Sequence, residues 1–149
     1  MIKFEALDEI YQRIEQLSES RFWLMANDVS TRNEIIRMNT DDQLYDKGID
    51  SIGANLGEYT PNTKRIKELK GQRFDHITLK DRGLFYDSWI VKVDERAINL
   101  DADDVADYDR PLFTVYGEDV LGLTDENMLK LKQMILFNYL INVNVEILR

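Results

Sequence analysis

The segment from Gln43 to Trp89 constrains the fold of this chain more than any other part of the sequence. It holds five of the seven glycines, which supply the turns of an irregular segment. Seven of the nineteen lysines and arginines lie between Lys64 and Arg82, and the single histidine, His76, lies among them. No catalytic constellation is recognisable in this segment. We therefore predict a shaped surface that contacts other protein.

The bulk composition predicts one globular domain, 1–149, that is long enough to bury its own core. The chain has no cysteine, which excludes disulfides and thiolate chemistry and fits a reducing compartment. The N-terminus carries acids where a signal peptide needs an apolar run. The most apolar stretch, Met134 to Val145, is interrupted by asparagines and is too short to cross a bilayer.

Apolar residues at helical spacing predict an amphipathic helix over about Lys3–Glu19. Thr31 and Glu34 form a capping box, which predicts a second helix from Arg32 to about Asp46. The glycines that follow predict a loop over 48–60.

Thr60 and Pro61 are typical of a helix start, and Gly71 is typical of a helix end. They predict a short basic helix over Pro61–Lys70. Thr124 is the predicted N-cap of a long C-terminal helix over Asp125 to about Asn142. Two apolar stripes on this helix predict burial on most sides. The final residues, 143–149, fit either a strand or an extension of the helix.

From Tyr86 onward the apolar residues recur at every second position, which is typical of β-strands. This alternation predicts a hairpin of Tyr86–Val93 with Ala97–Asp101. Leu112 to Tyr116 is rich in β-forming residues and is a candidate third strand. The predicted fold class is therefore α+β, with N-terminal helices, a small antiparallel β-sheet with a central hairpin, and a long C-terminal helix. Within the domain we expect an N-terminal helical region, 1–47, and a core, 61–149.

The charge of the chain is bipolar. The formal net charge of −9 argues against a sequence-independent nucleic-acid binder, because neutralising phosphates requires clustered cations. Residues 62–82 hold seven cations and three acids, while residues 101–126 hold nine acids and one cation. These segments suit a head-to-tail contact between identical copies, although they also fit two solvated surfaces that never meet. The candidate interaction residues are Lys64, Arg65, Lys67, Lys70, Arg73, Asp101, Asp103 and Asp104.

We predict no catalytic, cofactor or metal site. His76 has no second histidine or cysteine to share a metal, and no evident partner for base catalysis. Asp101 and Asp103 match the start of an EF-hand loop, but Val105 stands where a ligand is required. A solvated acidic loop is favoured over a divalent cation site.

Two other patterns have structural explanations. The glycine spacing of 48–53 does not match a phosphate-binding fingerprint, because no Gly-Lys-Ser/Thr follows. The aromatic cluster of Phe85, Tyr86 and Trp89 lies beside the basic segment and could stack on bases. Core packing is the favoured explanation for the cluster.

Several short motifs, each present once, follow one another in a characteristic order along the chain. Their positions are Gln43, Leu44, Gly48, Asp50, Gly53, Leu56, Tyr59, Thr63 and Lys67, then Leu79, Asp81, Gly83, Phe85, Tyr86, Ser88, Val91 and Val93, and finally Gly122, Leu123, Thr124 and Glu126. This pattern resembles bacteriophage virion-morphogenesis and tail-completion (head–tail joining) proteins. Arg82 departs from the threonine usual in that family, and the first forty residues lie outside the pattern.

The resemblance implies a non-enzymatic structural protein of the virion, made in the bacterial host cytoplasm and assembled as a ring at the neck or tail. Its implied partners are further copies of itself and portal, connector or tail proteins. An acidic chain suits the wall of a DNA passage, because a repulsive lumen lets the duplex slide. The competing hypotheses are another interaction module (an adaptor, an auxiliary capsid protein or an assembly chaperone) and an enzyme that uses the acidic loop.

Overall fold

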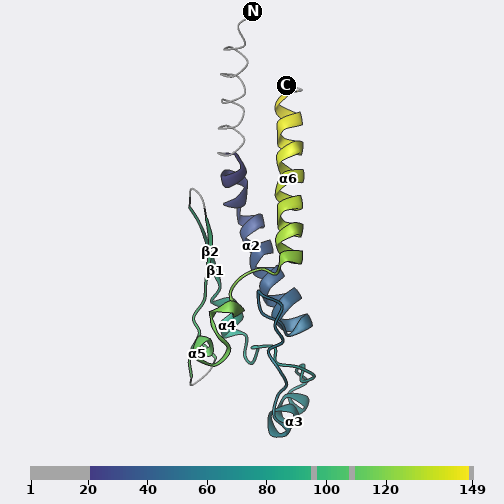
Figure 1. Ribbon diagram of the computed structural model, residues 1–149, viewed down its shortest axis with the longest axis vertical. Coiled ribbons are helices and arrows are strands. Elements are labelled where there is room, and N and C mark those ends of the chain that lie inside the picture. Colours follow the sequence, from purple (N-terminus) through teal and green to yellow (C-terminus); the bar gives the residue numbers. More distant parts are fainter. Residues whose placement is uncertain (1–20, 95–96, 108–109, 148–149) are drawn as a thin grey trace, which may run out of the picture.

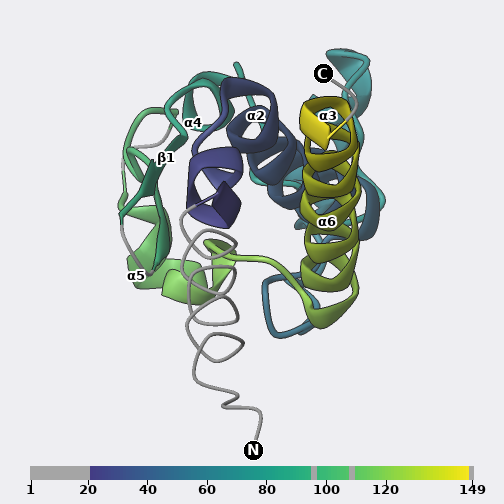
Figure 2. The same cartoon turned by 90° about the horizontal axis from the view of Figure 1, so that it is seen from above.

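The computed structural model describes residues 21–94, 97–107 and 110–147, so the helix expected over Lys3–Glu19 lies outside the described residues. Three elements run side by side, with helix α2 (Val29–Arg37) between a β-hairpin and the long C-terminal helix α6 (Asp125–Ile147) (Figures 1 and 2). The short helix α3 (Pro61–Leu69) lies at the opposite end of the molecule from the C-terminal end of α6 (Figure 1). The predicted α+β class is confirmed, with a two-stranded antiparallel sheet.

Helix α2 (Val29–Arg37) follows a helical stretch over residues 21–26 and begins at a different cap from the predicted one. The Asp28 carboxylate accepts a hydrogen bond from the Ser30 backbone N–H at 3.0 Å. Thr31 lies within the helix and is buried. The predicted capping box is therefore wrong, because an aspartate three residues earlier already satisfies the first free N–H groups.

Helix α2 runs directly into η1 (Met38–Lys47), a π-helix that occupies most of the second half of the predicted helix. Gly48 ends η1 in the left-handed region, at φ +63°, which confirms the predicted helix end. Glycine is suited to this position because a Cβ atom is strained at positive φ.

The loop over 48–60 is folded back on itself by the Asp50 side chain. Its carboxylate accepts hydrogen bonds from the Ile52 and Ala54 backbone N–H groups, at 3.1 and 2.8 Å. Helix α3 (Pro61–Leu69) follows, and the Thr60 hydroxyl accepts a hydrogen bond from its first turn. The predicted basic helix and its cap are confirmed.

The predicted hairpin exists but is shorter than expected. Strand β1 (Ile90–Val93) pairs antiparallel with β2 (Ile98–Asp101), with Val91 opposite Leu100. Residues before β1 form a short helix, α4 (Leu84–Asp87), instead of the start of the strand. The reason lies elsewhere in the chain, because the buried Asp107 carboxylate accepts the N–H groups that open α4.

The predicted third strand is also wrong, since Leu112–Tyr116 forms helix α5. Gly117, at φ +83°, ends α5 and leads into a 3-10 turn, η2 (Glu118–Val120). Helix α6 (Asp125–Ile147) then closes the chain, as predicted, with the Thr124 hydroxyl accepting from the Asn127 N–H. The residues after Asn142, which fit either a strand or an extension of the helix in the sequence, continue α6 as helix to Ile147. Among the described helices, none combines the length and apolar character of a membrane span.

The apolar interior divides into two clusters. One joins α4, the loop before it and the α5–η2 region, and it contains Leu44, Ile77, Leu79, Phe85, Tyr86, Trp89, Leu112 and Val120. The other joins α2, β1 and α6, and it contains Ala26, Ile35, Met38, Val91, Leu131 and Ile135. Core packing of the aromatic cluster is thus confirmed, and this burial is the main source of stability.

Three buried amide side chains connect the two clusters. Asn39 donates to the Val120 carbonyl at 3.0 Å and accepts from the Gly122 N–H at 2.6 Å. Gln43 donates to the Gly122 carbonyl at 2.9 Å and accepts from the Thr124 N–H at 2.9 Å. Asn127 donates to Gln43 at 2.9 Å and to the Met38 carbonyl at 3.1 Å. This amide network fixes the start of α6 against η1.

The amide network predicts the effect of Asn39→Leu, which keeps the number of side-chain heavy atoms but removes both hydrogen bonds. Since the Val120 carbonyl and Gly122 N–H are then left buried without partners, we expect a loss of about 2–4 kcal/mol in the free energy of unfolding. Urea denaturation followed by circular dichroism measures this. Asn62→Leu on the exposed surface of α3 is the control, with an expected change within about 0.5 kcal/mol. Equal losses in the two variants would contradict the role of the network.

Candidate interaction surfaces

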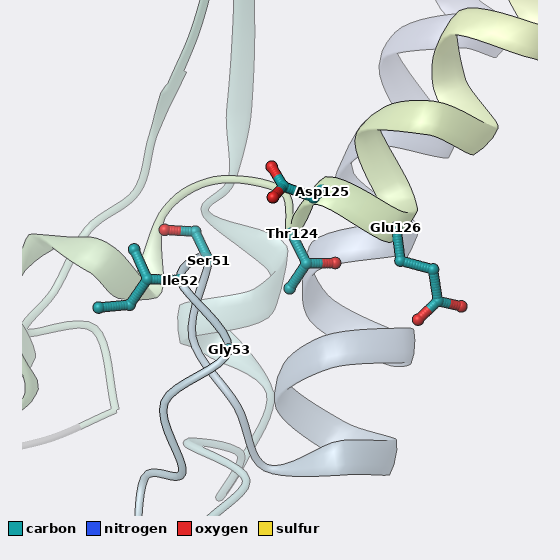
Figure 3. Close-up of a pocket in the computed structure, with 6 residues that line it drawn as sticks. All are labelled: Ser51, Ile52, Gly53, Thr124, Asp125 and Glu126. Atoms are coloured by element: carbon teal, nitrogen blue, oxygen red, sulfur yellow. The ribbon is translucent and has the colours of Figure 1, made fainter.

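A groove of about 420 Å³ lies between the loop over 48–60 and the start of α6 (Figure 3). The Ser51 N–H donates to the Asp119 carbonyl at 2.8 Å, which holds the loop beside η2. Gly122 approaches Ser51 closely, because a Cβ atom at this glycine would lie 2.9 Å from the Ser51 Cβ. The residues that line the groove are Ser51, Ile52, Gly53, Thr124, Asp125 and Glu126.

The charged rim of the groove is held in one ionisation state. Hydrogen bonds from Lys130, at 2.7 Å, and Lys47, at 2.9 Å, lower the pKa of Glu126 to about 2. Glu126 therefore stays ionised at neutral pH, which does not suit a general acid. Over the part of the chain that is described, no three histidine or acidic side chains gather as metal ligands.

His76 holds two segments together. Its Nε2 donates to the Tyr45 carbonyl at 2.8 Å, and its Nδ1 lies 3.3 Å from the Asp75 carboxylate. The ring also lies against Gly48, where an added Cβ atom would come within 2.4 Å of His76 Cδ2. These contacts join the end of η1 to the segment before α4, so His76 has a structural explanation.

The structure separates the five basic candidates by their partners. Lys64 pairs with Glu58 at 2.6 Å, and Lys70 pairs with Asp81 at 3.1 Å. Arg73 pairs with Asp75 at 2.8 Å and lies 3.3 Å from Asp46. Lys67 is buried and Arg65 is exposed, with no ion pair to any described residue. Much of the positive charge counted along the sequence is thus neutralised locally.

The buried Lys67 stabilises the fold. Its ammonium donates to the Lys80 carbonyl at 2.7 Å and lies 4.8 Å from the centre of the Tyr59 ring. Gln72 offers a third acceptor at 3.4 Å. These contacts compensate in part for the removal of the ammonium group from water. Lys67 is therefore not available to a second protein.

The outer face of α3 is formed by Arg65, Ile66 and Leu69, which share one side of the helix. Ile66 is 46% exposed and Leu69 is 82% exposed, whereas Lys67, on the opposite side, is 6% exposed. The usual polarity of a surface helix is thus inverted.

The acidic segment, residues 101–107, contains the three acidic candidates. Asp101 lies 3.9 Å from Lys92. Asp103 and Asp104 accept hydrogen bonds from the nearby Val105 and Phe113 N–H groups, and neither pairs with a cation among the described residues. The latter two carboxylates therefore remain available at the surface.

Asp107 has a role that the sequence analysis missed. Its side chain is buried, accepts from the Gly83 and Phe85 N–H groups at 3.2 and 3.1 Å, and lies 3.4 Å from Arg82. The available signal was Gly83 itself, because a glycine before a helix provides no side-chain cap. A remote carboxylate then has to supply one.

The basic and acidic candidates lie far apart in the molecule. Figure 2 shows α3 and α5 on opposite sides. The acidic segment adjoins α5, because the Leu112 N–H donates to the Asp104 carbonyl at 3.0 Å. The two sets of candidates therefore do not form one site within a single chain.

The apolar outer face of α6 is the largest departure from the expected burial. Asn127, Leu131 and Ile135 face the core, whereas the opposite side of the helix is exposed. Phe137 is 64% exposed and Leu136 is 56% exposed. The predicted burial of both stripes is therefore wrong. This outer face consists of Leu129, Leu136, Phe137, Leu140 and Ile141.

Comparison with models of known protein families, with curated proteins and with solved structures found no match for this chain.

The contact between Gly48 and His76 predicts a specific difference between two glycines. Gly48→Ala introduces both a positive-φ alanine, at about 1–2 kcal/mol, and a clash with the imidazole ring, at about 1–3 kcal/mol. Gly53→Ala is the matched control, because Gly53 has φ +81° and open space around it. We expect unfolding in urea to show the larger loss for Gly48→Ala.

The clash itself is tested by a double-mutant cycle with His76→Ala. If the ring causes the extra loss, the two substitutions are less costly together than the sum of their separate effects. Strict additivity would show that the loss comes from backbone strain alone.

Proposed function

We propose that this protein is a non-enzymatic structural component of a bacteriophage virion, at the head–tail interface or tail end, and that it works by contacting further protein subunits. The observation that carries the proposal is the apolar outer face of α6. Contiguous exposed apolar surface of this kind marks protein interfaces, because it is costly to leave in water.

The position of this face supports assembly over intramolecular packing. The core-facing side of α6 is already covered by α2 and the start of η1, because Leu131 and Ile135 lie in one buried cluster with Ile35 and Met38. The outer face therefore has no remaining partner among the described residues that form the core. A neighbouring subunit that covers it would bury large apolar side chains, which is the composition of interface centres.

The resemblance of the sequence pattern to phage joining and completion proteins supports the choice of class. Many of its positions have structural roles in this chain. Gly48 and Gly83 adopt positive φ, Asp50 closes the loop turn, and Tyr59 hydrogen-bonds to Thr78 at 3.0 Å. A pattern of this kind specifies a fold, and the resemblance implies no catalytic residue in this chain.

The distribution of charge is compatible with a ring. Complementary patches on opposite sides of a subunit give heterologous contacts, which close into a ring when the rotation permits. The net charge of −9 suits a lumen through which DNA slides, because acidic walls repel phosphates.

An adaptor, an auxiliary capsid protein or an assembly chaperone is the second candidate. The internal pairing of Lys64, Lys70 and Arg73 favours it, since it reduces the charge available for self-association. Under this alternative the outer face of α6 receives an apolar helix of a different protein.

Native mass spectrometry and negative-stain microscopy distinguish these functions. We expect a closed ring of about six to twelve copies, formed alone or on addition of portal or tail proteins of the same phage. A chain that stays monomeric at high concentration and in the presence of those proteins would contradict the proposal.

The apolar outer face gives a second prediction. Leu136→Gln combined with Leu140→Gln removes apolar contact area without touching the core, so we expect the folded monomer to persist while assembly is lost. Sedimentation velocity measures assembly, and circular dichroism checks the helix content. Leu24→Gln is the control and should assemble normally, because Leu24 is 73% exposed and lies outside α6. Assembly of the double variant at the wild-type concentration would exclude this face as an interface.

A further inference from the structure

Helix α3 has the opposite polarity to that expected of a helix on the surface of a monomer. Its lysine at position 67 lies inside, and its isoleucine and leucine at positions 66 and 69 lie outside. Rotating the helix about its axis would bury the apolar side chains and expose the ammonium group. The contacts of Lys67 with the Lys80 carbonyl and the Tyr59 ring fix the observed orientation instead. The outer face is therefore presented to something outside the chain.

Arg65 adds charge to this face. It lies one helical turn before Leu69, on the same side of α3, and it is exposed without an ion-pair partner among the described residues. Neighbouring Lys64 is engaged by Glu58. The partner that fits this surface thus offers a carboxylate beside a small apolar group.

The acidic segment offers that combination. Asp103 is exposed and Asp104 is half-buried, neither is paired with any described cation, and the next residue, Val105, is an exposed apolar side chain. Among the described residues, each carboxylate accepts a single backbone N–H, which leaves acceptor positions for a guanidinium group. The match in charge and in apolar character points to a second copy of this chain as the occupant.

We propose that the outer face of α3 binds the segment Asp103–Val105 of the next copy. Arg65 pairs with the two carboxylates, and Leu69 packs with Ile66 against Val105. Because α3 and the acidic segment lie on opposite sides of the molecule (Figure 2), the contact is head-to-tail and repeats around a ring. This inference rests on the proposed function as a ring subunit and names the contact that joins neighbouring subunits.

Charge reversal on each side of the contact tests the proposal. Arg65→Glu places like charges together, and so does the pair Asp103→Lys with Asp104→Lys. We expect each variant, as the full chain, to require at least about tenfold higher concentration to assemble, in line with close charge pairs at other interfaces. Asn33→Glu adds a negative charge on the exposed side of α2, outside the proposed contact surfaces, and is the control. Thermal unfolding checks that every variant is folded.

Mixing the two charge-reversed variants gives the decisive result. In an alternating array, the glutamate introduced by Arg65→Glu in one copy would meet the introduced lysines of the next, and the native Arg65 would meet native aspartates. We therefore expect neither variant alone to assemble at the wild-type concentration, whereas their equimolar mixture should assemble near it. Neutralising Arg65 with Arg65→Gln should have a weaker effect than reversal.

The possible failures separate the two proposals. If the wild-type chain forms rings, but Arg65→Glu leaves them unchanged or the mixture does not recover, the α3 contact is wrong and the ring function stands. If the wild-type chain forms no assembly alone or with portal and tail proteins, both proposals are wrong.

Discussion

The amide network of Asn39, Gln43 and Asn127 is the interaction on which the arrangement of this protein depends. It joins side chains of η1 to backbone groups about eighty residues later in the chain, at Val120, Gly122 and Thr124. Amides suit this role because each provides both donors and an acceptor in a fixed geometry. Apolar contact alone would allow α6 to slide or rotate along α2, whereas these bonds specify one position. The same bonds therefore determine which side of α6 faces outward.

Local signals were sufficient for elements whose ends are defined by neighbouring residues. Thr60 with Pro61 and Gly71 predicted the boundaries of α3, and Thr124 predicted the start of α6, because caps act over one helical turn. The errors came from elements that depend on distant groups. Leu112–Tyr116 contains β-forming residues, but no strand is available to pair with it among the described residues, and the turn at Gly117 ends it after one helical turn. The tendency of a residue to form a strand depends mostly on the neighbours against which it packs, and a single sequence does not show these neighbours.

The sequence was sufficient to locate the charged segments, but not to predict which of their side chains are buried or paired. Counting residues located a basic segment and an acidic segment, yet it could not show that Lys67 lies inside or that Lys70 is paired with Asp81. These outcomes depend on contacts between residues more than ten positions apart. The spacing of leucines in α6 likewise showed two apolar stripes without showing which one the core would use. Exposure of the second stripe follows from the orientation that the amide network imposes.

The exposed apolar surfaces and the acidic charge act over different distances. Two copies that each carry −9 repel one another, but salt at physiological concentration screens this repulsion within about 8 Å. Charge pairs that become buried between subunits are screened much less. In the proposed assembly, a local match such as Arg65 with Asp103 and Asp104 would therefore determine orientation, and the apolar faces of α3 and α6 would contribute affinity once the subunits are aligned. Such a subunit would assemble only with a correctly oriented neighbour.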